Sequence, residues 1–157
     1  MKFRSGFGRA EAFLDCDTVL EDLHLVAESD RAVAVFMVAV DPRTALADAL
    51  SWLVTRRFQA ESLEAEKVIE LRAAAALADR IDEHRGVDAK APIRVNADEV
   101  RLLIEAVVAY VSERDTESYQ PPEERSRLGE LSSLLDPLFD LALELDRADE
   151  VLRGSAI

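Results

Sequence analysis

The feature that most limits how this chain can fold is a long helical pattern over residues 42–85. After Pro42, neither Gly nor Pro occurs until Gly86, and apolar residues recur at helical spacing. Asp41 and Pro42 are typical of a helix start, because Asp accepts hydrogen bonds from free backbone N–H groups and Pro fits the first helical turn. This stretch therefore predicts one or two helices at the centre of the fold.

The length of residues 42–85 raises the question of a break. One unbroken helix would be roughly 65 Å long, whereas a compact domain of this chain length has a radius of gyration of about 15 Å. Charged residues weaken the apolar stripe in the middle, yet no strong helix breaker occurs there. The pattern allows one helix or two, and helix-length statistics favour a break near residues 59–62, with Ser62 as the second N-cap.

The second half of the chain is predicted to form a helix hairpin over residues 96–153. Asn96 and Glu99 make a capping box, in which each side chain bonds the backbone N–H of the other residue. The helix that they start should end near residue 117, before the break at Pro121 and Pro122. A second helix then runs over residues 122–153, with Pro137 as a point of kinking or restart.

The first forty residues allow more than one kind of secondary structure. Residues 1–8 are interpreted as a flexible lead-in, and residues 9–28 as a helix with one apolar seam: Phe13, Cys16, Leu20, Leu23 and Ala27. The apolar run over 32–40 suits a buried helix or a strand. We favour the helix, because a strand needs a neighbour to pair its backbone, and only residues 23–27 could supply one as a hairpin arm. Residues 87–95 are interpreted as an extended connection. A short β-hairpin near residues 23–40 is the alternative.

Together these patterns predict a single all-α domain over residues 1–157. It would be a helical bundle of two helix hairpins, with about four to six helices, and an N-terminal helical arm over residues 9–40. The composition agrees, because 49% of the residues are apolar, and Gly and Pro are scarce, at five each. That is enough apolar material for a core.

The net charge of −13 limits the partners that can be expected. No basic patch offsets it, which argues against direct binding to nucleic acid or to an anionic membrane and favours a basic protein. The single Cys16 cannot form an internal disulfide, which is typical of a reducing compartment. We therefore expect a cytoplasmic protein.

Two groups of side chains were considered as metal sites. Glu21 and His24 have the Glu-x-x-His spacing of di-iron bundles, but such sites need a second motif, and His84 lacks a Glu three residues before it. An acidic cluster on the central stretch could hold Mg²⁺: Glu61, Glu64, Glu66 and Glu70. Neighbouring Lys67 favours surface ion pairs instead. We predict no metal, catalytic or cofactor-binding residue.

Other reactive or aromatic residues have equally simple interpretations. Cys16 lies between Asp15 and Asp17, whose charges oppose thiolate formation, so we expect a buried thiol and not a nucleophile. The large aromatics are expected to be core or half-buried residues more than binding anchors: Trp52, Phe58, Tyr110 and Tyr119.

The leading hypothesis is a non-enzymatic, oligomeric protein–protein interaction or assembly module that binds a second copy of itself or a basic protein. The predicted contact residues are Phe13, Leu20, Leu23 and Phe36. One alternative is an acidic mimic of nucleic acid, of the kind that some phages encode, presenting Asp79, Asp82, Glu83, Asp140, Glu144 and Asp149. Another is a Mg²⁺-dependent all-helical hydrolase that uses the acidic cluster.

Overall fold

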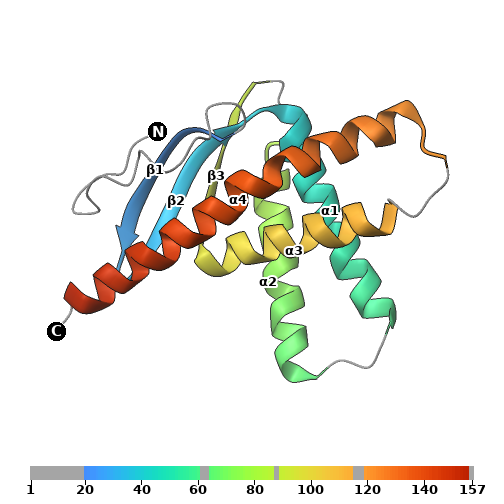
Figure 1. The fold of residues 1–157 in the computed structure, drawn as a ribbon. Coiled ribbons are helices and arrows are strands. Elements are labelled where there is room, and N and C mark those ends of the chain that lie inside the picture. The colour runs from blue at the N-terminus through green and yellow to red at the C-terminus, as the bar shows by residue number, and fades with distance from the viewer. Residues whose placement is uncertain (1–19, 61–63, 87–88, 115–118, 156–157) are drawn as a thin grey trace.

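The computed structural model describes residues 20–60, 64–86, 89–114 and 119–155. Within these ranges the chain forms three strands and four helices. In chain order they are β1 (Glu21–Glu28), β2 (Arg31–Val38), α1 (Val40–Ala60), α2 (Ala65–Asp82), β3 (Ala91–Asn96), α3 (Ala97–Arg114) and α4 (Pro122–Ser155). The strands pair antiparallel in the order β1-β2-β3 (Figure 1).

The predicted all-α bundle with an N-terminal helical arm is therefore wrong. Residues 21–38 form a β-hairpin, which is the arrangement that we weighed as the alternative, and a third strand joins it. The physical reason is that β2 has a second strand to pair with. Residues 91–96 form this strand, more than fifty positions after β2 in the sequence, and Phe36 lies opposite Ile93 in the register. Residues 9–19 of the predicted arm lie outside the described residues.

The hairpin between β1 and β2 turns without glycine. Glu28 pairs with Arg31, so Ser29 and Asp30 form a two-residue loop. Ser29 has a φ of 58°, and a positive φ at the first loop position alone is typical of a type II′ turn. Because this turn normally selects Gly at that position, the hairpin carries little signal in the sequence.

The third strand contains Pro92, which explains why the sequence suggested a mere connection. Ala91, Ile93 and Val95 point into the core, whereas Pro92 and Arg94 point out. Arg80 of α2 donates to the Arg94 carbonyl from beside the sheet, at 2.8 Å, so residues 92, 94 and 96 direct their backbone groups to the free edge. The N–H that Pro92 lacks would point to this free edge, where no neighbouring strand would accept a hydrogen bond from it.

The free edge of β3 is closed to further strands. Pro92 offers no donor, Arg80 occupies the Arg94 carbonyl, and the Asn96 N–H donates to Glu99 Oε1 at 2.9 Å. The Glu99 N–H donates in return to Asn96 Oδ1 at 3.0 Å, which confirms the predicted capping box at the start of α3. This protects the edge from pairing with another chain.

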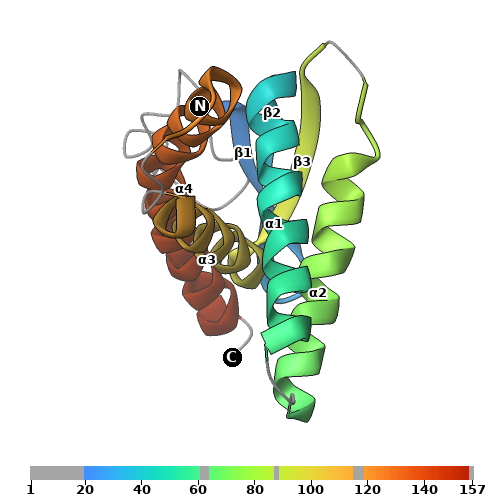
Figure 2. The ribbon, with the colours of Figure 1, turned by 90° about the vertical axis from the view of Figure 1, so that its right-hand side faces the viewer.

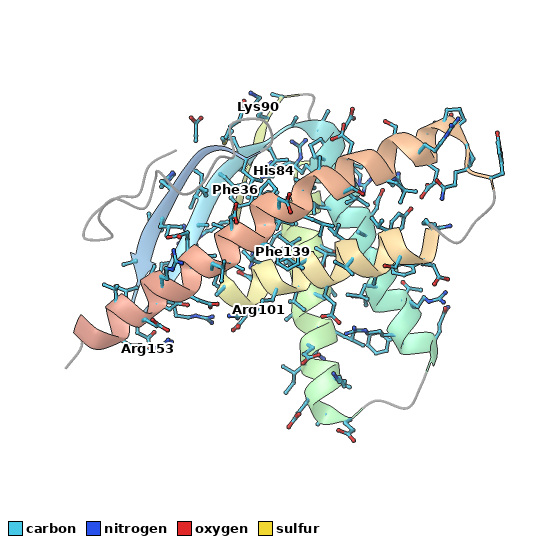
Figure 3. All side chains as sticks on the ribbon, viewed as in Figure 1. Phe36, His84, Lys90, Arg101, Phe139 and Arg153 are labelled. Atoms are coloured by element: carbon cyan, nitrogen blue, oxygen red, sulfur yellow. The ribbon has the colours of Figure 1, made fainter. Side chains whose placement is uncertain are left out.

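The helices cover one face of the sheet. α4 packs on β2, α3 packs near the end of β3, and α1 lies against α2, α3 and α4. Figure 1 shows α4 crossing the molecule diagonally, and Figure 2 shows α1 and α2 running side by side with their linked ends projecting beyond the body. The core draws on all seven elements, with Phe36 of β2 buried among the helices (Figure 3).

The helix boundaries agree with several predictions. The central stretch breaks into α1 and α2, although the N-cap of α2 is Glu64, and Ser62 lies outside the described residues. Gly86 has a φ of 87°, the left-handed conformation that Gly adopts without strain. The predicted hairpin over 96–153 corresponds to α3 and α4, and α4 continues through Pro137.

A buried arginine joins the sheet to the helices. Arg43 of α1 is almost fully buried, and its guanidinium donates to the carbonyls of Val38, Ala89 and His84 at 3.0, 3.2 and 3.1 Å. These carbonyls belong to the end of β2, the approach to β3 and the turn after α2. One side chain therefore holds three chain segments that would otherwise need separate donors.

We expect Arg43→Met to lower the free energy of unfolding by about 3 kcal/mol, because it removes the donor from one buried and two half-buried carbonyls at once. Urea unfolding followed by circular dichroism measures this loss. The matched control is Arg72→Met on the exposed side of α2, which should change stability by less than about 0.5 kcal/mol. Equal effects of the two substitutions would contradict the role given to Arg43.

Candidate interaction surface

The residues predicted to contact a partner are mostly inside the fold. Leu20, Leu23 and Phe36 are each about 1% exposed and belong to the core, and Phe13 lies outside the described residues. In the predicted seam, Ala27 is exposed near the end of β1, whereas Leu20 and Leu23 are buried. These buried side chains offer no surface to a partner in this fold.

The candidate metal ligands do not converge. Glu21 and His24 now lie on a strand, where the ring Nδ1 of His24 is 3.0 Å from the Asp22 carbonyl oxygen. On α2, Lys67 pairs with Glu70 at 3.6 Å, as expected for a solvated helix face. Among the described residues, no group of three or more His, Cys, Asp or Glu could hold a metal ion. Cys16 and Glu61 lie outside those residues.

The acids of the nucleic-acid-mimic hypothesis differ widely in environment. Glu144 and Asp149 are about 5% exposed, and Asp82 pairs with Arg85 at 2.6 Å. Asp79, Glu83 and Asp140 are exposed. Half of the set is thus buried or neutralised by a cation, and it does not form the exposed row of charges that a mimic of duplex DNA requires.

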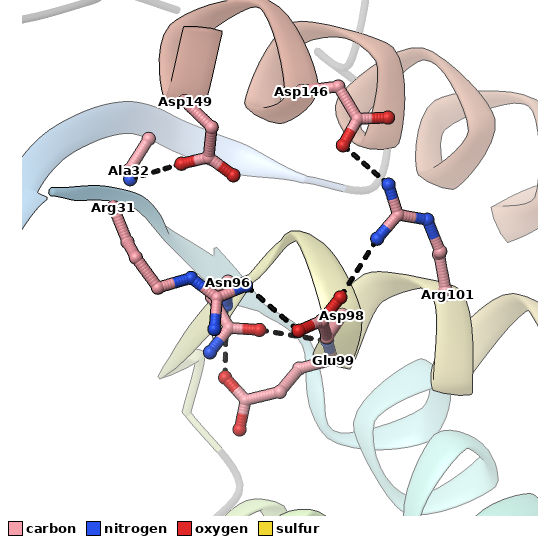
Figure 4. A network of polar contacts seen from close by, with 8 residues as sticks. All are labelled: Arg31, Ala32, Asn96, Asp98, Glu99, Arg101, Asp146 and Asp149. Carbon is pink, nitrogen blue, oxygen red and sulfur yellow. Dashed lines mark hydrogen bonds and ion pairs between the residues drawn. The ribbon is translucent and has the colours of Figure 1, made fainter. Parts of the chain in front are cut away.

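Asp149 has a structural role at the point where β3 stops. The last β2–β3 pair is Val33 with Asn96, so the Ala32 N–H has no strand to bond. Asp149 of α4 accepts this N–H at 2.6 Å (Figure 4). Nearby, Asp98 accepts from Arg31 and from Arg101, and Arg101 also pairs with Asp146. This network fastens α4 to the hairpin and to α3.

A second polar network surrounds Tyr110 of α3. Its hydroxyl donates to Glu124 Oε1 at 2.8 Å, and Arg127 lies close enough to influence its pKa. Trp52 packs edge-on against the Tyr110 ring, at 5.4 Å between the ring centroids, and the Arg114 guanidinium lies over the Tyr110 ring. Burial raises the pKa of the Tyr110 hydroxyl, and the bond to Glu124 adds to the rise while Arg127 opposes it. These contacts make Tyr110 part of the core.

Two surface hollows were considered as binding sites. One, of about 480 Å³, lies between the first turns of α1 and α4 and is lined by Asp41, Thr44, Ala45, Pro122, Glu123, Ser126, Arg127 and Glu130. The charge of Arg127 is already shared with Asp48, at 3.2 Å. The other, of about 220 Å³, lies between α2 and β3. Neither hollow presents a set of groups that selects a ligand.

The most distinctive surface is apolar and lies along α3 and α4. We call it the outer ridge and define it as Ile104, Val108, Leu135, Phe139 and Leu143. Val108, Phe139 and Leu143 are 42%, 49% and 57% exposed, while Ile104 and Leu135 are half-buried against the core. Phe139 lies near the middle of α4, where that helix passes α3 (Figure 3).

Helical spacing arranges the outer ridge in two rows. Val108 follows Ile104 by four residues, and Leu135, Phe139 and Leu143 are also four apart, so each set forms one row on its helix. The two rows lie on helices that pack against each other. Large exposed apolar side chains gathered in this way are typical of a protein-binding surface.

Two free carboxylates border the outer ridge. Asp136 and Asp140 are exposed on α4, and neither has an ion pair or side-chain hydrogen bond within the described part of the chain. The nearby acids Asp146 and Glu144 are instead paired with Arg101 and Arg147. The outer ridge is therefore apolar at its centre and negatively charged along one side.

Comparisons with known proteins give no relative: no family model matches the sequence, and neither a curated protein nor a solved structure matches it. No helix in the described ranges is long and apolar enough to cross a membrane.

The environment of Tyr110 predicts a pH dependence of stability. Because the folded-state pKa is raised above the usual value of about 10, this hydroxyl contributes stability below pH 10 that is lost as pH rises through the folded pKa. Tyr110→Phe should remove that part of the alkaline loss, as measured by thermal unfolding from pH 9 upward at about half-unit steps.

The control for this measurement is Tyr119→Phe, which changes the one other tyrosine, an exposed residue, and leaves Tyr110 in place. It should retain the full alkaline loss. An identical pH profile for wild type and Tyr110→Phe would show that the folded state does not perturb this hydroxyl.

Proposed function

We propose that the protein is a non-enzymatic interaction module that binds another protein through the outer ridge. The observation that supports this most directly is the exposure of Phe139 and Leu143, one turn apart on α4. Water contact with large apolar side chains is unfavourable, by about 25 cal/mol for each Å². A partner that covers them gains this free energy on binding.

The outer ridge is a better candidate than the other exposed apolar residues. Phe58 and Ile69 are 54% and 66% exposed near the projecting ends of α1 and α2. Phe58 and Ile69 belong to the pair of helices α1 and α2, whose outer side packs against few other elements. The outer ridge instead lies on α3 and α4, which are fixed to each other and to the sheet. A rigid support lowers the entropic cost of binding.

A photo-crosslinking side chain placed at position 139 tests the proposal. In cells that produce the protein, irradiation should join it to one discrete partner and give a single heavier species. The same group at position 69 is the matched control, because Ile69 is at least as exposed and lies on a different surface. No adduct at position 139, or equal adducts at both positions, would contradict the proposal.

The double variant Phe139→Ser/Leu143→Ser should remain folded. Both side chains are about half exposed, so we expect the free energy of unfolding to change by less than about 1 kcal/mol, as measured by urea unfolding. A loss comparable to that of a core truncation, about 3 kcal/mol or more, would show that these residues hold the fold and are not a binding surface.

A further inference from the structure

The charges beside the outer ridge point to the chemistry of its partner. We infer that the outer ridge binds an amphipathic helix whose apolar face is bordered by Lys or Arg. This inference rests on the proposed function and adds the identity of the binding element. It is carried by the position of Asp136 and Asp140 relative to Phe139 and Leu143.

The two carboxylates and the two apolar side chains occupy the same exposed side of α4. Asp136 precedes Phe139 by three residues, and Asp140 precedes Leu143 by three, so each acid lies one turn from an apolar neighbour. A bound helix that covers Phe139 and Leu143 therefore places its flanking side chains beside two carboxylates that lack a partner of their own. Basic side chains satisfy them, and acidic ones are repelled.

Among the described residues, no basic side chain pairs with Asp136 or Asp140. Arg147, one turn beyond Leu143, is held by Glu144 at 2.6 Å. Arg125 and Arg153 lie about 15 Å along α4 from Leu135 and Leu143 respectively, at 1.5 Å per residue. A cationic partner is therefore attracted in two ways. The net charge of −13 attracts it to the whole chain, and the two unpaired carboxylates attract it to the outer ridge.

A second copy of the chain is a poorer occupant. In a two-fold dimer the same patch meets itself, which brings Asp136 and Asp140 of one protomer toward the same acids of the other. Each protomer also carries a charge of −13, which opposes association at low salt. A partner helix with basic flanks meets neither obstacle.

The shape of the outer ridge fits a helix. The row on α4 spans about 12 Å from Leu135 to Leu143, and Ile104 and Val108 form a second row on α3. Apolar side chains at positions i, i+4 and i+7 of an amphipathic helix have the spacing to cover rows of this length.

Two synthetic peptides of about five helical turns test the inference. Both have the same leucine face, and they differ only in flanks of lysine or of glutamate. Fluorescence anisotropy should show that the lysine peptide binds and the glutamate peptide does not. Phe139→Ser/Leu143→Ser should weaken binding at least about 30-fold, and Asp136→Asn/Asp140→Asn about 3- to 10-fold, with less dependence on salt.

Matched variants keep these comparisons specific. Phe58→Ser/Ile69→Ser removes an equally exposed aromatic and aliphatic pair elsewhere, and Glu66→Gln/Asp79→Asn removes two exposed acids from α2 with the same change of net charge. Both should bind the lysine peptide within about twofold of wild type. Effects equal to those of the outer-ridge variants would overturn the inference, because they would indicate binding by general hydrophobicity or charge.

The remaining outcomes separate the inference from the proposed function. If both peptides bind equally, and only Phe139→Ser/Leu143→Ser abolishes binding, the basic partner is wrong and the outer ridge stands as a binding surface. If neither peptide binds, the amphipathic helix is wrong, while crosslinking at position 139 still decides the proposed function. Association of labelled with unlabelled protein that depends on Phe139 would replace the basic partner with a second copy.

Discussion

The rest of the structure depends on satisfying the backbone of the central strand, β2. Its N–H and C=O groups bond to β1 on one side and to β3 on the other, and Asp149 of α4 accepts the Ala32 N–H where β3 stops. A buried backbone N–H or C=O group without a hydrogen bond lowers the free energy of unfolding by about as much as several favourable contacts raise it. This requirement brings together segments of the chain that are far apart in sequence, and α4 becomes a structural neighbour of the first hairpin.

Arg43 extends the same requirement to the helices. It gives donors to carbonyls at the end of β2, after α2 and before β3, so the connection through α1 and α2 returns the chain to the sheet edge. With the sheet face covered by α3 and α4, the outward sides of these two helices remain open to solvent. The outer ridge is thus a consequence of how the sheet is completed.

Local features of this fold could be predicted from the sequence, and distant pairings could not. The capping box of Asn96 and Glu99 involves neighbours in one turn, and the break between α1 and α2 follows from charge and length. The pairing of Phe36 with Ile93 leaves no local pattern, and Pro92 argued against a strand until its position at the free edge was known. Because the sequence did not reveal this pairing, Leu20, Leu23 and Phe36 were assigned to a partner surface, although they fill the core.

The sequence did contain a signal for the outer ridge, because Phe139 and Leu143 lie outside the buried stripe of α4 that includes Leu138, Leu141 and Leu145. Val108 gave no such signal, since the apolar stripe of α3 is wide enough to include it.

The outer ridge on α3 and α4 is the proposed binding surface of this protein. Methyl NMR spectra recorded during addition of the lysine-flanked peptide test this proposal, because Val108 and Leu143 report on the outer ridge and Ile69 reports on α2. We expect saturable shifts of the Val108 and Leu143 methyl signals and none at Ile69. Shifts centred on Ile69 and its neighbours on α2, or spread evenly over the molecule, would contradict it.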